Sequence, residues 1–133
     1  MRAFLFTDGA SRGNPGPAGA GIVIKDAAGS VLAEKFQFLG RMTNNEAEYR
    51  ALLLGLLTAQ TTLDPRDTLV VLMDSQLVVS QLKGEFKIKA PHLKELLSQA
   101  KAAEGQFAEV VYKLIPREKN SHADRLANRA LDG

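Results

Sequence analysis

The sequence predicts an α/β fold in which one mixed β-sheet carries helices on its faces. Three short apolar segments, residues 2–7, 20–25 and 31–39, follow one another with only short connections, which favours an antiparallel meander. Two more apolar segments, residues 68–73 and 108–115, are set apart by helical patterns, as in parallel crossover units. We therefore expect five strands and four helices in the order β-β-β-α-β-α-α-β-α.

The first half of the chain supplies the meander and one long helix. Residues 8–17 contain three glycines and two prolines, so we expect a loop after the first strand. Residues 26–29 form the next turn. Thr43 and Glu46 have the spacing of a capping box, which predicts a helix over about residues 44–60.

The second half alternates helices with the last two strands. A short helix is expected over residues 76–82, with Gly84 as its stop. Pro91 suits the first turn of the next helix, and Gly105 ends it. Ser121 opens the final helix.

Size and composition limit the possible classes of protein. A chain of 133 residues has room for a single domain, residues 1–133, and the absence of cysteine excludes a disulfide scaffold. No apolar stretch reaches membrane-spanning length, and the N-terminus lacks a secretory cleavage pattern, so we expect a cytoplasmic protein. The net charge of +2 permits a polyanionic partner without requiring one. We expect a monomer with no obligate protein partner.

Four carboxylates stand where predicted strands end or predicted helices begin. Asp8 and Asp74 close apolar segments, while Glu48 and Asp124 lie in first helical turns. If strands 1 and 4 are parallel neighbours, Asp8 and Asp74 meet at one edge of the sheet. A cluster of carboxylates without sulfur suits Mg²⁺ or Mn²⁺ and does not suit Zn²⁺.

Each carboxylate also has an ordinary structural interpretation, except Glu48. A lone aspartate at a strand end is usually a solvated turn residue. Glu48, however, shares a helical stripe with Ala51 and Gly55, so it should point inward, where an unpaired charge is costly. Neighbouring Glu46 needs only a structural role, capping the helix and pairing with Arg50.

Four short motifs occur in order along the chain. They are Thr7-Asp8-Gly9-Ala10 with Gly13-Asn14-Pro15-Gly16, then Thr43-Asn44-Asn45-x-x-Glu48, then Asp74-Ser75-Gln76, then Ala123-Asp124-x-x-Ala127. Together they resemble type 1 ribonuclease H over residues 2–131, and in particular its compact archaeal and bacterial branch. One motif alone is weak, but four in this order on the expected elements are highly specific.

The resemblance implies a fold and an activity. The fold is ribonuclease H-like, a five-stranded mixed sheet with strands 1–3 antiparallel, strands 1, 4 and 5 parallel, and helices on both faces. The activity is endonucleolytic hydrolysis of the RNA strand of an RNA–DNA hybrid, giving 5′-phosphate and 3′-hydroxyl ends. Asp8, Glu48, Asp74 and Asp124 would hold two Mg²⁺ ions, with Mn²⁺ able to substitute.

The resemblance also implies roles in binding the substrate. Telling RNA from DNA requires contact with the 2′-hydroxyl, which amide side chains can provide. The residues expected to read the minor groove are Asn14, Asn44, Asn45 and Gln76. Arg41 and Thr43 would hold a phosphate of the DNA strand.

The chain departs from the family pattern in two places. Many members carry a loop histidine before the last aspartate, whereas His122 lies too close to Asp124 to match it. We expect Arg117, or failing that Lys119, to act there as a fixed charge. The basic protrusion of some members looks absent from the compact segment 83–94.

Two alternatives remain beside a hybrid-specific nuclease. The first is a non-cleaving hybrid-binding module on the same fold, which the loss of one carboxylate would favour, and all four are present. The second is the ribonuclease H domain of a reverse transcriptase. The chain begins at Met1 and ends soon after the last predicted helix, which we take to favour a free-standing enzyme.

Overall fold

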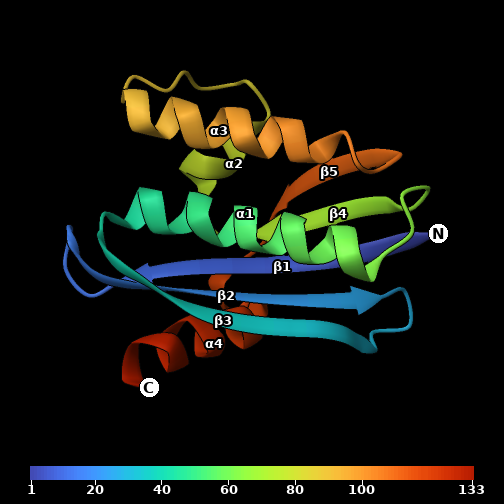
Figure 1. Ribbon diagram of the computed structural model, residues 1–133, viewed down its shortest axis with the longest axis horizontal. Coiled ribbons are helices and arrows are strands. Elements are labelled where there is room, and N and C mark those ends of the chain that lie inside the picture. The colour runs from blue at the N-terminus through green and yellow to red at the C-terminus, as the bar shows by residue number, and fades with distance from the viewer.

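Five strands form one mixed sheet in the order β3-β2-β1-β4-β5 (Figure 1). The computed structural model describes residues 1–133. Strands β1, β2 and β3 pair antiparallel, and β4 pairs parallel with both β1 and β5. The predicted topology is confirmed. The strand bounds are β1 Arg2–Ser11, β2 Gly16–Asp26, β3 Val31–Met42, β4 Thr68–Met73 and β5 Glu109–Leu114.

Helices cover both faces of this sheet, as expected. Helix α1 packs on β1 and β2 and carries α3 on its outer side, while α4 lies across the opposite face (Figure 1). None of the four α-helices combines the length and the apolarity that a membrane crossing requires. The helix bounds are α1 Asn44–Thr62, α2 Gln76–Leu82, α3 Pro91–Glu104 and α4 Ser121–Asp132, with a 3₁₀ turn at Arg117–Lys119.

The main core fills the space between the sheet and α1. Leu5 of β1, Leu52 of α1 and Val71 of β4 are fully buried in it. Tyr49 is also buried, and its hydroxyl donates a 2.7 Å hydrogen bond to Gln81 Oε1 on α2. The helical stripe predicted from residue spacing is therefore the buried face of α1.

The prediction of a loop over residues 8–17 is wrong in its length. Strand β1 continues through Ser11 and β2 begins at Gly16, so only residues 12–15 connect them. The parallel ladder to β4 ends at Phe6, but the antiparallel ladder to β2 continues through Asp8 and beyond. Glycine and proline in this segment indicated a loop, whereas cross-strand pairing keeps most of it extended. Asp8 is consequently held on a strand, just past the end of β4.

Two glycines let helices approach the sheet beside Asp8. A Cβ atom at Gly9 would overlap the backbone of Ala47 and Glu48 in α1. A Cβ atom at Gly21, the cross-strand partner of Asp8, would overlap the backbone of α4 at Ala123. Both helices can therefore bring carboxylates close to the strand that carries Asp8.

Candidate active site

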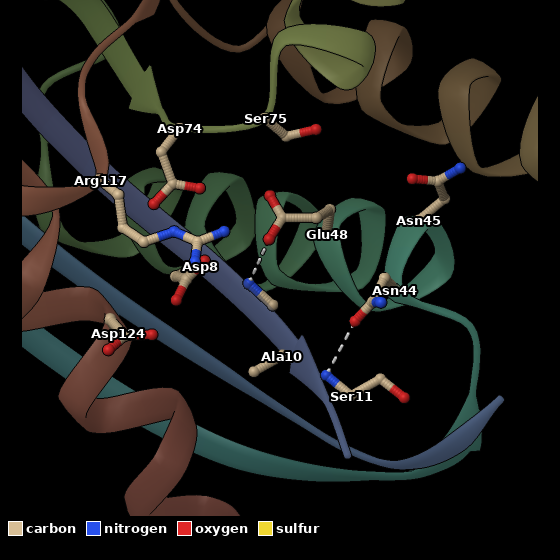
Figure 2. A pocket seen from close by; sticks show the side chains of 11 residues that line it. Asp8, Ala10, Ser11, Asn44, Asn45, Glu48, Asp74, Ser75, Arg117 and Asp124 are labelled. Carbon is tan, nitrogen blue, oxygen red and sulfur yellow. Dashed lines mark hydrogen bonds between the residues drawn. The ribbon is translucent and has the colours of Figure 1, made fainter. Parts of the chain in front are cut away.

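A pocket of about 360 Å³ brings together the four predicted carboxylates (Figure 2). Asp8 comes from β1, Glu48 from α1, Asp74 from the end of β4, and Asp124 from the first turn of α4. These elements are distant in sequence and meet because β1 and β4 are parallel neighbours between α1 and α4. The other residues lining the pocket are Gly9, Ala10, Ser11, Asn44, Asn45, Ser75 and Arg117.

Three of the four carboxylates form a tight cluster. Asp8, Glu48 and Asp74 each offer an oxygen that lies within 4.8 Å of the others. Asp124 is not part of this trio, but it lines the same pocket (Figure 2). The predicted cluster is therefore present, with Asp124 at its edge.

Glu48 has one oxygen bonded and one buried oxygen without a partner. The Gly9 backbone N–H donates a 2.9 Å hydrogen bond to Glu48 Oε1. Oε2 is buried and receives no hydrogen bond, and Glu48 as a whole is only 7 % exposed. A buried carboxylate oxygen without a donor is unfavourable, and a bound cation would satisfy it.

Burial raises the pKa values of two of the carboxylates, Asp8 and Glu48. Burial raises the pKa of Asp8 to about 10, assisted by the charge of Glu48, a hydrogen bond with Asp124 and the charge of Asp74. Burial likewise raises the pKa of Glu48 to about 7, against the lowering effect of the Gly9 N–H. Without a cation, the site therefore holds a proton more readily than isolated carboxyl groups would.

Asn120 is a residue of this site that the sequence alone did not reveal. It is 1 % exposed, and its Nδ2 donates to Thr7 O at 2.9 Å and to Asp74 Oδ2 at 3.2 Å. Its own backbone oxygen accepts the N–H of Asp124, four residues ahead. Asn120 directly precedes α4, which begins at Ser121 as expected. It therefore links β1, the end of β4 and the start of α4.

Arg117 is the one basic side chain among the residues lining the pocket. Its guanidinium extends from the 3₁₀ turn toward Asp8, between Asp74 and Asp124 (Figure 2). Its positive charge is one of the influences that lower the pKa of Glu48. His122 points elsewhere, because its Nε2 lies 2.8 Å from Glu34 Oε2 on β3.

Two of the six residues expected to bind substrate line the pocket. Asn44 and Asn45 line it, and Asn14 accepts the Asn44 backbone N–H at 3.1 Å through its Oδ1. Thr43 caps α1 by accepting the Glu46 N–H at 3.2 Å. The other four expected residues do not line the pocket, namely Asn14, Arg41, Thr43 and Gln76.

Glu46 lies in the first turn of α1 as expected, but its expected ion pair is wrong. Its carboxylate lies 3.5 Å from Nε2 of His92 on α3, and the structure gives it no bond to Arg50. Helix α3 packs against α1, so His92 from α3 takes the place of the expected partner Arg50, which lies one turn further along α1. Glu46 faces α3 while Glu48 faces the pocket.

The donor set fits hard divalent cations. The pocket contains four carboxylates, amide and hydroxyl groups, and no histidine or cysteine. Mg²⁺ and Mn²⁺ prefer such oxygen ligands, and Glu48, a member of the cluster, has a buried oxygen without a hydrogen-bond donor. The residues present therefore fit a divalent-cation site.

Comparison with known families agrees with this geometry. The family model described as "Reverse transcriptase-like" matches residues 6–130. In a solved structure, RNase H1 of the archaeon Halobacterium salinarum superposes with a TM-score of 0.94 at 40 % identity, covering 99 % of this chain and 98 % of that chain. The chain belongs to the ribonuclease H family. The family and the fold expected from the four motifs are thus confirmed.

Two curated relatives are longer than this chain and match it over part of their length. A bifunctional protein of Mycobacterium tuberculosis is 50 % identical over 133 residues, which are 99 % of this chain and 36 % of that protein. The ribonuclease HI of Halobacterium salinarum is 40 % identical over 131 residues, covering 98 % of this chain and 65 % of that protein. The chain therefore spans between about a third and two thirds of the length of these relatives.

A second solved structure shows a relative with nucleic acid. LC11-RNase H1, in complex with an RNA/DNA hybrid, has a TM-score of 0.93 at 42 % identity and covers 98 % of this chain and 96 % of that chain.

Proposed function

We propose that this chain hydrolyses the RNA strand of RNA–DNA hybrids with two bound Mg²⁺ ions, which Mn²⁺ can replace. The observation that carries the proposal is the buried, unpartnered Glu48 Oε2 inside a pocket with three other carboxylates. Membership of the ribonuclease H family and the hybrid-bound relative support the substrate class. The products would carry 5′-phosphate and 3′-hydroxyl ends.

The proposed chemistry assigns each carboxylate a task. Hydrolysis of a phosphodiester requires an activated water and a stabilised departing 3′ oxygen, and a pair of divalent ions supplies both. Asp8, Glu48, Asp74 and Asp124 would hold the ions, with Asp8 and Asp74 as the central ligands. Four carboxylates largely offset the charge of two such ions, which leaves the pocket able to accept a phosphate.

Arg117 would contribute a fixed positive charge beside the scissile phosphate. A guanidinium stays protonated at any working pH, so it can hold a phosphate but cannot carry a proton to or from water. Its place in the pocket lining supports this role, and the direction of His122 toward Glu34 disfavours the histidine. Arg117 would therefore act electrostatically, on phosphate positioning or product departure.

The substrate would lie across the rim of the pocket. The minor groove would meet Asn14, Asn44, Asn45 and Gln76, and a DNA-strand phosphate would meet Arg41 and Thr43. We propose that the chain acts as a monomer without an obligate protein partner. The proposed enzyme is a single ribonuclease H domain, residues 1–133, that acts in the cytoplasm.

A doubly labelled hybrid tests this proposal directly. The RNA and DNA strands carry different fluorophores, and the purified chain is added with Mg²⁺, with Mn²⁺ or with excess EDTA. We expect the RNA strand alone to be cut, in both metals and not in EDTA. Ligation of the downstream RNA product without prior kinase treatment reports a 5′-phosphate.

Matched variants separate the possible outcomes. Asp74→Asn should abolish cleavage, whereas Glu109→Gln, at an exposed carboxylate on β5, should not change it. Cleavage in EDTA, or cutting of the DNA strand, would contradict the proposal. Tight binding of the hybrid without any cleavage by the wild type would instead favour a non-cleaving binding module.

A further inference from the structure

Ser11 joins three strand ends at the rim of the pocket. It is the last residue of β1 and lines the pocket with Asn44 (Figure 2). Its hydroxyl lies 3.0 Å from Met42 O at the end of β3 and 3.4 Å from Gly16 O at the start of β2. It also contacts Gly13 O in the connection between β1 and β2. These carbonyl oxygens share the single hydroxyl proton of Ser11, which lies between the segment that carries Asn14 and the segment that leads into Asn44.

Two backbone N–H groups fix the amides of Asn44 and Asn14. The Ser11 N–H donates to Asn44 Oδ1 at 3.2 Å, and the Asn44 N–H donates to Asn14 Oδ1 at 3.1 Å. A backbone N–H can only donate, so the amide atom that faces it must be the oxygen. The –NH₂ group of each asparagine is therefore directed away from its backbone partner, and both groups remain available as donors.

We propose that Ser11 is a positioning residue that holds Asn14 and Asn44 as hydrogen-bond donors toward the minor groove of the hybrid. This inference rests on the proposed function. Every base pair presents N3 or O2 acceptors in the minor groove, so donors there give contacts that do not depend on sequence. The oxygen of a ribose 2′-hydroxyl is a further acceptor, and only the RNA strand carries it.

The proposal differs from a purely structural role in what Ser11→Ala changes. If Ser11 only stabilised the hairpin, its loss would lower thermal stability and leave substrate preference intact. If Ser11 positions the two amides, its loss should weaken binding of the hybrid more than binding of a DNA duplex of the same sequence. The carboxylate cluster should still turn over bound substrate, because Ser11 has no hydrogen bond to any of its carboxylates.

The first test measures binding and turnover of Ser11→Ala, Ser11→Thr and a control. Ser98→Ala removes an exposed hydroxyl from α3 and serves as that control. We expect Ser11→Ala to raise KM for the hybrid roughly fivefold, the effect of losing one net hydrogen bond, with kcat within twofold. Ser11→Thr, which keeps the hydroxyl, should restore KM, and Ser98→Ala should match the wild type.

Binding without cleavage gives the second readout and keeps the inference separate from the proposed function. Fluorescence anisotropy in EDTA compares the Kd of the hybrid with that of the DNA duplex. The wild type should bind the hybrid more tightly than the DNA duplex. We expect Ser11→Ala to bring the two Kd values closer together and Ser11→Thr to keep the difference between them. A ratio of the two Kd values unchanged in Ser11→Ala would overturn the inference, even if the wild type cleaves hybrids as proposed.

Asn44→Asp tests the amide orientation if Ser11→Ala does not fold. The aspartate keeps an oxygen to accept the Ser11 N–H and removes only the outward donor. It should lose at least as much hybrid affinity as Asn44→Ala. If Asn44→Asp binds the hybrid as well as the wild type, the outward atom is not a donor and the inference fails.

Discussion

Replacing Asp8 by asparagine should stabilise the metal-free protein while abolishing cleavage. Asp8 is 6 % exposed, and burial together with Glu48, Asp124 and Asp74 raises its pKa to about 10. In the unfolded chain its pKa returns to the ordinary value of 3.8. The folded state must therefore either protonate this carboxyl at neutral pH or bury its charge among others, and a neutral amide at this position would avoid both.

The size and the sign of the effect follow from this pKa difference. Because the folded-state pKa is raised, the stability of the wild type is fully present below about pH 4 and falls as pH rises toward about 10. At pH 7 the loss is at most about 4 kcal/mol, from roughly three pH units above 3.8 at about 1.4 kcal/mol each. At roughly 3 °C per kcal/mol for a domain of this size, Asp8→Asn should raise Tm by up to about 12 °C.

Thermal unfolding followed by circular dichroism in EDTA measures this prediction. The gain of Asp8→Asn should be near zero at pH 3, clear at pH 7 and larger at pH 9. Glu109→Gln, an exposed carboxylate, should show no such trend. Added Mg²⁺ should raise Tm of the wild type more than that of Asp8→Asn. A fall in Tm at pH 7, or a gain independent of pH, would refute the reasoning.

Three further outcomes follow from the geometry of the pocket. Glu48→Gln should remove most activity because a proposed metal ligand is lost, whereas Glu46→Gln, which faces α3, should stay within a few fold in the same cleavage assay. Arg117→Ala should lower kcat far more than it changes hybrid affinity, and a larger effect of His122→Ala would show that the histidine role was misplaced. Asn120→Ala should lower the free energy of unfolding by about 2 kcal/mol in urea, since it leaves the buried Thr7 oxygen without its donor. The same variant should also have a lower kcat, and an unchanged kcat would show that Asn120 does not affect the active site.

The sequence predicted the elements well where the determining pattern is local. Strand β4 and helix α2 have the expected bounds, because the signals that predict them lie within a few residues. These signals are the apolar segment for β4 and the nearby glycine stop for α2. The inward direction of Glu48 was predicted for the same reason, from the stripe it shares with Ala51 and Gly55. The meeting of Asp8 with Asp74 followed from the rule that parallel strands end together.

What the sequence did not reveal depends on partners distant along the chain. Asn120 bonds to Thr7, 113 residues away, and to Asp74, 46 residues away, so no local pattern marks it. The pair between Glu46 and His92 likewise depends on how α3 docks on α1. Strand β1 extends to Ser11 because β2 pairs with it there, against the local preference of glycine and proline for turns.

Asp8 and Asn120 should have opposite effects on stability, although both should be needed for activity. Asp8 is buried next to other carboxylates, so at neutral pH the metal-free fold is less stable with it than without it, and a bound cation would reverse that cost. Asn120 is neutral and buried, and its donors serve both the backbone of β1 and the carboxylate of Asp74. Removing Asp8 should therefore raise stability and end activity, whereas removing Asn120 should lower both. If both variants lose activity while only the Asp8 variant gains stability, the carboxylates are gathered for cation binding. Asn120 then supports the part of the fold that holds them together.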